Sequence, residues 1–389
     1  MIRGAITKAL APTWASTAAG AAIGALAWDA SLAQLALAPL AVSLWATRPT
    51  RLAAWLAMLA YYLAAARGLP FGAAKFFGSD TPAAFSAALW FGASLALSAP
   101  WAALWGRAGY FWRVPAALVL CTVPPIGIVG WANPATAAGV FFPMLGWFGL
   151  ALMVCALVML CYRPLHSAAV LTACAFVGSL VSTAGAPAWL QAHNTAYGGA
   201  GGAGRDFMRD YAANQNMIEL AARSSAPFVL FPETTAGLWN DATTGLWGDL
   251  AAHLRSQGRT VLVGAEVPVA GTSRSRNALV LVGRDNGELV QRIPVPVSMW
   301  KPWADAGTEA NLLGDGIGLI NGQRAAVFIC YEQLLTWPML LSQAASPQLM
   351  IGAANDYWAA DTSIPGIQTM TLRAWGRLFN VPLVAAVNI

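Results

Sequence analysis

The chain has 389 residues, of which 58% are hydrophobic and only 10% are charged. A soluble globular protein carries about 25% charged residues, so this composition argues against a wholly soluble fold and places much of the chain in lipid. The formal net charge of +5 is modest and its basic residues are scattered. A nucleic-acid-binding surface needs clustered charge, so no direct nucleic-acid partner is expected.

The cysteines and histidines do not form a metal-binding pattern. No Cys-x-x-Cys pair occurs, and the three histidines lie far apart. Neither a metal nor another cofactor is therefore expected. Four of the five cysteines fall in apolar segments of the first half, where a cysteine usually packs as a small hydrophobe. Cys330 is the only one after Cys174, so the second half has no cysteine pair for a disulfide.

Seven apolar segments in the first half predict transmembrane helices. Each approaches or exceeds the roughly 20 residues that span a bilayer, although the second and third are short. They cover residues 9–28, 32–46, 52–66, 82–105, 110–131, 135–162 and 168–182. The first also resembles a signal peptide, but more apolar segments follow, so we interpret it as an uncleaved helix.

The loops between these segments predict an orientation. Basic residues alternate mostly to one side, which places the N-terminus in the cytoplasm and everything after about residue 182 outside it. Arg67 and Lys75 are exceptions. The segments carry no obvious internal charge apart from Arg113 near an end, which disfavours a solute transporter. We expect a transmembrane domain at 1–184 and an outer domain at 185–389.

The second half has the composition and patterning of an α/β domain. Helices are expected at 206–224, 245–257 and 366–379, and strands at 188–192, 227–231, 260–267, 349–356 and 382–387. Asp285-Asn286-Gly287 and Asn321-Gly322 each mark a hairpin between further strands. Alternating helices and strands with inserted hairpins predict a mixed sheet covered by helices, in a layered α/β sandwich.

Three predicted strands each end in a polar side chain. The segment 228–233 ends in Glu233, the segment 325–330 ends in Cys330, and the segment 349–356 ends in Asn355 and Asp356. We expect these ends to meet at one sheet edge, where a following helix would favour the Cys330 thiolate. The alternatives are inert packing for the cysteine and turn capping for Asn355 and Asp356.

This order of strand ends resembles the nitrilase (carbon–nitrogen hydrolase) superfamily. The attached multi-span N-terminus resembles its membrane-anchored branch, which includes apolipoprotein N-acyltransferase and conjugal-transfer relatives. The matching motifs are FPET at 231–234, ICYE at 329–332, NDYW at 355–358 and the helix at 368–373. The resemblance implies an αββα sandwich after a bundle of about seven spans, in the bacterial inner membrane with the second domain in the periplasm.

The resemblance also implies a mechanism. Glu233 would be the general base, and Cys330 would attack an acyl carbon to give a thioester. A lysine and the backbone N–H after the cysteine would stabilise the oxyanion. Tyr331, Glu332 and Asn355 would support these groups.

The sequence departs from the family pattern at the lysine. The corresponding stretch, VQRIPVPVSM at 290–299, contains none, and Met299 replaces a loop glutamate of the family. Lys301, the only lysine after Lys75, and Arg292 are the candidates for the positive charge, although a guanidinium is not a point charge like an ammonium.

Two functions remain open at this point. The resemblance implies a membrane-anchored amidase or acyltransferase in plasmid conjugal transfer, with a membrane lipid or another acyl donor and proteins of the conjugation apparatus as partners. The alternative is a nitrilase fold that has lost its lysine and acts as a structural component of that apparatus. A positive charge beside Cys330 and Glu233 would favour the enzyme.

Overall fold

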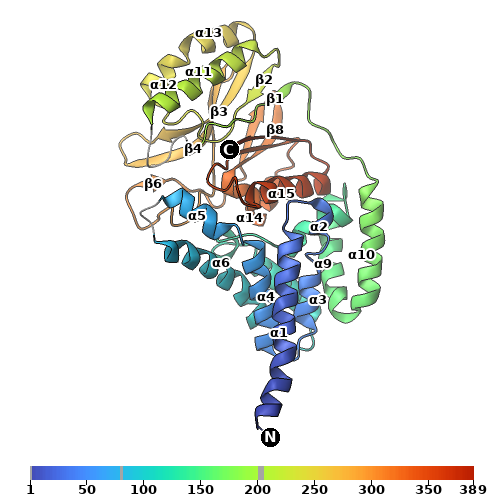
Figure 1. The fold of residues 1–389 in the computed structure, drawn as a ribbon. Coiled ribbons are helices and arrows are strands. Elements are labelled where there is room, and N and C mark those ends of the chain that lie inside the picture. The colour runs from blue at the N-terminus through green and yellow to red at the C-terminus, as the bar shows by residue number, and fades with distance from the viewer. Residues whose placement is uncertain (1, 79–81, 200–205) are drawn as a thin grey trace. The chain divides into compact units, whose positions relative to one another are not determined.

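The computed structural model describes residues 2–78, 82–199 and 206–389, with side chains from residue 13 onward (Figure 1). Its contacts divide the chain into two compact units, each built from more than one stretch of sequence. The helical unit comprises Met1–Thr183, Leu334–Trp337 and Asp361–Asn380. The α/β unit comprises Ala184–Gln333, Pro338–Ala360 and Val381–Ile389.

The helical unit consists of helices that range from short 3-10 turns to the 26 residues of α1. Their bounds are α1 (Ile2–Ala27), α2 (Leu32–Leu35), α3 (Leu40–Ala46), α4 (Arg51–Ala65), α5 (Leu69–Phe77), α6 (Ala83–Ala103), α7 (Tyr110–Leu120), η1 (Ile126–Ile128), η2 (Pro134–Ala137), α8 (Ala138–Phe141), α9 (Gly146–Tyr162), α10 (Pro164–Ser179) and α15 (Ile364–Phe379). The last of these comes from far along the chain and packs against α8 and α9.

The α1 and α4 helices approach closely because glycine lies at their contact. A Cβ atom at Gly20 would lie 2.1 Å from the Ala57 carbonyl oxygen, and one at Gly24 would lie 2.1 Å from that of Tyr61. These two glycines stand four residues apart, a spacing that places small residues on one helix face. The indole N–H of Trp28 donates to the Tyr61 hydroxyl at 2.8 Å inside the same contact.

The predicted bundle of about seven membrane spans is wrong. Among the described residues, one helix, α6, is long and apolar enough to cross a membrane by itself, and up to three spans result if each of two bent helix pairs is counted as one. The multi-pass topology, and the orientation inferred from it, lose their basis. Part of the first predicted segment, residues 9–12, lies outside the described side chains.

Prolines and bends in the chain explain why the length of the apolar segments predicted too many membrane spans. A helix rises 1.5 Å per residue, so the 15 residues of α4 cover about 22 Å of a roughly 30 Å hydrocarbon layer. The predicted segment 32–46 is two short helices, with Pro39 between them. The segment 110–131 leaves the helix after Leu120, ahead of Pro124 and Pro125. The segment 135–162 bends by 119° between η2–α8 and α9.

The α/β unit contains two sheets. Strands β1 (Leu190–Ala192), β2 (Phe228–Leu230), β3 (Thr260–Pro268), β4 (Arg274–Gly283) and β5 (Gly287–Val290) follow one another in the first sheet, and β6 (Gly307–Thr308) also pairs with β4. The second sheet has the order β10 (Leu383–Asn388), β9 (Leu349–Asn355), β8 (Gln323–Ile329) and β7 (Ile317–Ile320). The pairs β1–β2–β3 and β10–β9–β8 are parallel.

Two hydrophobic cores hold these layers together. One contains buried residues of both sheets, such as Leu230 and Leu262 with Val327 and Ile351, so the sheets pack face to face. The other joins the opposite face of the first sheet to α11 (Phe207–Arg223) and α13 (Gly248–Ser256), near α12 (Asp241–Leu246). Side chains alternate across a strand, so β2 contributes Phe228 and Leu230 to one core and Val229 to the other.

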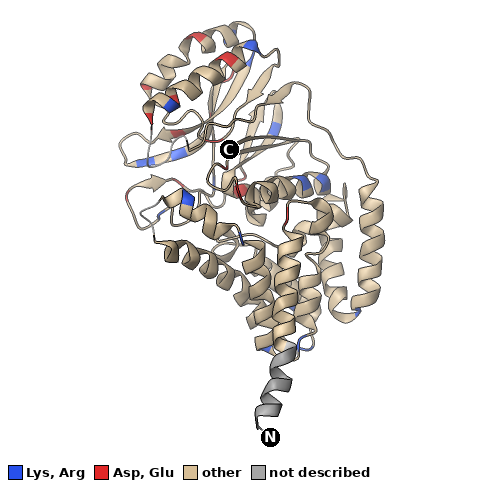
Figure 2. Ribbon diagram, in the orientation of Figure 1, with Lys and Arg blue, Asp and Glu red and all other residues tan. Residues whose placement is uncertain are grey.

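The two units differ in charge. Figure 2 shows that α3 to α10 carry few charged residues, whereas α11, α13 and the strand ends carry many. The mixed α/β character expected of the second half is present, and β8 leads directly into η3 (Cys330–Leu334) and then α14 (Thr336–Ala344).

Candidate active site

The ends of three strands meet in the α/β unit. Glu233 follows β2, Cys330 follows β8, and Asn355 is the last residue of β9. The Asn355 backbone N–H donates to Glu233 Oε2 at 2.8 Å, across 122 residues of sequence. Gly264 lets β3 pass close to the backbone that carries Glu233, since a Cβ there would lie 2.1 Å from the Pro232 carbonyl oxygen. The structure therefore brings these three predicted residues together.

Glu233 is a buried carboxylate with neutral hydrogen-bond donors. Its side chain is 4% exposed. The Asn277 amide donates to Oε1 at 2.6 Å, and the Cys330 side chain is a third hydrogen-bond partner. Burial, which disfavours the charged form, raises the pKa of Glu233 to about 7 despite these bonds. The group is thus divided between its acid and base forms at neutral pH.

Cys330 sits in a strained turn next to that carboxylate. Its φ of +50° is in the left-handed region, which costs a non-glycine residue about 1–2 kcal/mol. Thr234, directly after Glu233, has a φ of +52°. Residues with strained backbone are often found at functional sites. Here one of them is Cys330 itself and the other adjoins Glu233.

The Cys330 thiol is held in its protonated form. Burial first, and then the neighbouring carboxylates of Glu233 and Asp356, raise the pKa of the thiol well above its usual value. The Tyr331 backbone N–H hydrogen-bonds the sulfur and acts in the opposite direction. The expected stabilisation of a thiolate by a helix start is too weak here, because η3 is a five-residue 3-10 helix and the carboxylates are close.

Glu332 and Arg292 form a separate buried pair. Arg292 Nε lies 3.1 Å from Glu332 Oε1, and the two side chains are 4% and 0% exposed. Glu332 also accepts from the backbone N–H groups of Arg292, Ile293 and Ile329 at 2.8–3.1 Å. The remaining Arg292 nitrogens donate to Ser342 and to backbone carbonyls. These contacts place the Arg292 charge against Glu332, and none of them within the described residues joins Arg292 to Cys330 or Glu233.

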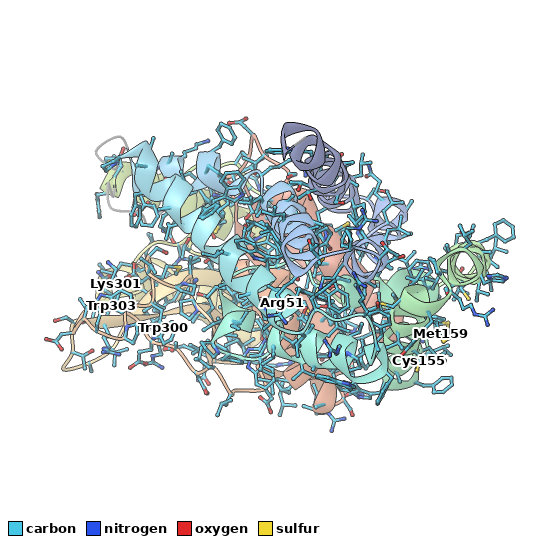
Figure 3. The ribbon with its side chains drawn as sticks, turned by 90° about the horizontal axis from the view of Figure 1, so that it is seen from below. Arg51, Cys155, Met159, Trp300, Lys301 and Trp303 are labelled. Carbon is cyan, nitrogen blue, oxygen red and sulfur yellow. The ribbon has the colours of Figure 1, made fainter. Side chains whose placement is uncertain are left out.

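Lys301 is exposed on the loop that leads into β6. Figure 3 shows it grouped with Trp300 and Trp303, and the Trp303 side chain is 70% exposed. The loop is closed by hydrogen bonds of its own backbone, for instance from Val297 N to the Trp300 carbonyl at 3.0 Å. None of the contacts in the described part of the chain joins Lys301 to Cys330 or Glu233.

Three amide side chains that sequence reasoning missed complete the site. Asn277 donates both to Glu233 and to Gln291 Oε1, the latter at 2.9 Å, while Gln291 donates to the Ile329 carbonyl at 2.8 Å. Asn388 donates to Asn355 Oδ1 at 2.7 Å. The only sequence signal was position: Gln291 stands beside Arg292 in the stretch where the family lysine was sought. An amide there supplies hydrogen bonds but no positive charge.

The described residues contain no group of three or more His, Cys, Asp or Glu side chains placed to hold a metal ion. The arrangement offers a thiol, a carboxylate that can accept its proton, and backbone N–H donors at the start of η3.

Fold and site together define a protein with a buried cysteine–carboxylate pair at the edge of an α/β sandwich, joined to an apolar helical unit. The chain is 34% identical to the conjugal transfer protein TraB of Agrobacterium fabrum, over 94% of this chain and 90% of that protein. It is 32% identical to a probable conjugal transfer protein TraB of Sinorhizobium fredii, over 96% and 97%. The chain belongs to the TraB family of conjugal transfer proteins, which confirms the predicted relationship.

Two of the solved structures with a partial likeness to this chain are of an amidase. One is an amidase from Nesterenkonia sp. AN1 that carries acrylamide at its active-site cysteine, with 16% identity, a TM-score of 0.37 and coverage of 51% of this chain and 77% of that one. Another is a mutant of the Nesterenkonia AN1 amidase, described as from the nitrilase superfamily. It has a TM-score of 0.36 and 16% identity, with coverage of 51% of this chain and 74% of that one. No family model matches the chain.

Proposed function

We propose that this protein is a cysteine-dependent acyl-transfer enzyme, of amidase or N-acyltransferase type, that serves plasmid conjugal transfer. The names of its two relatives support the biological role. The observation that carries the proposal is the hydrogen bond between Cys330 and Glu233. Because the pKa of Glu233 is about 7, its carboxylate can take the thiol proton near neutral pH.

The steps follow from this pair. The Cys330 sulfur attacks an acyl carbon while its proton passes to the ionised Glu233 carboxylate. The developing oxyanion is met by backbone N–H groups at the start of η3. Glu233 then returns the proton to the leaving group, an amine when the donor is an amide or an alcohol when it is a lipid ester. The bond from the acyl carbon to that group breaks, which leaves a thioester on Cys330. Water or a second amine releases the acyl group.

Association of the helical unit with a membrane is part of this proposal. Its described surface exposes many large apolar side chains, including Trp14, Phe111, Phe148 and Phe176 at 66–70%. Exposed apolar surface on that scale marks contact with lipid or protein. A lipid acyl donor and partner proteins of the conjugation apparatus are compatible with such a location.

The test is the pH dependence of Cys330 alkylation in the purified full-length protein. Iodoacetamide is added between pH 5.5 and 9.5, and modification is followed by intact mass and peptide mapping. If Glu233 takes the thiol proton, the rate rises through pH 7 and then levels off. Cys330→Ala removes the adduct on the Cys330 peptide and leaves any adduct on the exposed Cys155. Glu233→Gln lowers the plateau of the Cys330 rate by about 10²–10⁴-fold, the usual contribution of a general base.

A second function is favoured by the placement of the cations. Arg292 pairs with Glu332 and Lys301 is exposed, which is what a structural component that has lost its chemistry would show. In that case Cys330 stays unmodified at every pH until the protein is denatured. An unmodified cysteine in the native protein would therefore overturn the enzyme and leave the structural role.

A further inference from the structure

Arg209 of α11 is connected to the candidate active site through Gly199 and Tyr357. Its Nη2 donates to the Gly199 carbonyl at 2.6 Å. The Tyr357 ring lies against the same residue, since a Cβ built at Gly199 would be 2.6 Å from Tyr357 Cε2. Tyr357 follows Asn355 by two residues, and Asn355 bonds Glu233. The guanidinium therefore stands on the Tyr357 side of the pair.

Two further observations indicate that Arg209 is more than a tie to Gly199. Its Nε is buried and, within the described ranges, has no hydrogen-bond partner, although a guanidinium carries five donors. Tyr357 senses both Arg209 and Glu233: burial raises its pKa, the Arg209 charge lowers it and the Glu233 charge raises it. The half-buried tyrosine is thus within electrostatic range of both a cation and the reactive carboxylate.

The charges of the site make this cation important for substrate choice. Glu233 and Asp356 are both buried beside Cys330, and an anionic substrate would be repelled by them. Two other arginines near the strand ends already have acidic partners: Arg292 pairs with Glu332, and Arg276 pairs with Glu288 and Glu309. A substrate with a negative group needs a cation with a spare donor, and among the described residues the Arg209 Nε has no hydrogen-bond partner.

We infer that Arg209 binds a carboxylate of the substrate, at a short distance from the carbonyl that Cys330 attacks. The inference rests on the proposed acyl-transfer function and names its substrate class: an acyl compound or amide that carries a carboxylate. The planar guanidinium suits this ligand, because its N–H groups match the two oxygens of a carboxylate.

The experiment compares two alkylating reagents that differ in one group. Iodoacetylglycine carries a carboxylate and iodoacetylglycinamide a neutral amide, and both transfer the same carbon to the thiol with loss of iodide. The ratio of their rates at Cys330 is measured for wild type, Arg209→Gln, Arg209→Lys and the control Arg223→Gln. Arg223 is on the same helix, is 77% exposed and pairs with Glu219.

Wild type is expected to favour iodoacetylglycine, and Arg209→Gln to lower the ratio about tenfold, a loss typical of one charge-assisted hydrogen bond. Arg209→Lys keeps part of the preference, and Arg223→Gln keeps all of it. An unchanged neutral-reagent rate shows that the site remains folded. A ratio that Arg209→Gln leaves unchanged overturns the inference alone. If neither reagent modifies native Cys330, the proposed function fails and the inference fails with it.

Discussion

Glu233 and Glu332 are two buried glutamates at neighbouring strand ends, and their surroundings differ in one respect. Glu332 is met by three backbone N–H groups and by a guanidinium. Glu233 is met by one amide, one backbone N–H and a thiol, all neutral. A buried charge that has its counterion is fixed in one protonation state and serves structure. A buried carboxylate without one is left able to exchange a proton.

The largest expected effect concerns Glu332, the glutamate that pairs with Arg292. Arg292→Gln leaves Glu332 charged and buried without its partner, so the free energy of unfolding should fall by about 3–5 kcal/mol. Chemical denaturation of the full-length protein in detergent would measure the fall. A loss below about 1 kcal/mol would mean that the backbone N–H groups suffice and that the comparison is wrong.

The next largest effect is the pH dependence of stability that comes from Glu233. The pKa of Glu233 is about 7 in the folded protein against 4.5 for an ordinary glutamate, so the folded state holds an extra proton between these values. Stability from this group is complete below about pH 4.5 and is lost as pH rises through 7, by about 3 kcal/mol in total.

The measurement is the difference in unfolding free energy between wild type and Glu233→Gln at several pH values. Other titrating groups, such as His193, cancel in this difference. The advantage of the variant should grow as pH rises from 4.5 to 7.5. A difference that stays constant over this range would show that Glu233 titrates normally.

A third variant gives Glu233 a nearby positive charge, as Glu332 already has in Arg292. Gln291→Lys places a cation beside Asn277, which bonds Glu233, and should lower the pKa of Glu233. The midpoint of the Cys330 alkylation profile should then move below pH 7 by at least about one unit, equivalent to 1.4 kcal/mol. Gln291→Met, similar in shape but uncharged, is the matched control, and a midpoint that moves equally in both would refute the electrostatic account.

The smallest effect is expected at Lys301. Its side chain is exposed, so Lys301→Gln should change stability by no more than about 0.5 kcal/mol and alkylation of Cys330 by less than twofold. A tenfold drop in the alkylation rate would restore Lys301 to the site and would show that its loop moves.

The parts of the structure that sequence could predict are those that depend on local pattern. The buried strands before Glu233 and Cys330 are recognisable as apolar runs, and β3 at Thr260–Pro268 lies within one residue of its predicted position. Span counting failed because hydropathy does not register that Pro124, Pro125 or Pro143 interrupts an apolar segment. A tryptophan or tyrosine buried between helices also looks the same in sequence as one that faces lipid.

The amide side chains around the site could not be predicted for a different reason. Asn277, Gln291 and Asn388 come from three separate strands or their ends, and only the tertiary fold shows that they meet. The resemblance directed attention to a missing lysine, and therefore to Lys301 and Arg292. It gave no reason to ask what a neutral side chain at Gln291 would do. The roles of Glu233, Cys330 and Asn355 in catalysis remain predictions that the experiments above test.

The position of Asn388 has a consequence for how the protein matures. Asn388 bonds Thr195 across 193 residues and Asn355 across 33. Contacts that close such long loops form late, because the entropy of the intervening chain must be lost first. As the ribosome releases the chain from its N-terminus, Cys330 and Glu233 emerge before the strand that completes their surroundings. The thiol should therefore be most open to oxidation in that interval, before the final strand has docked.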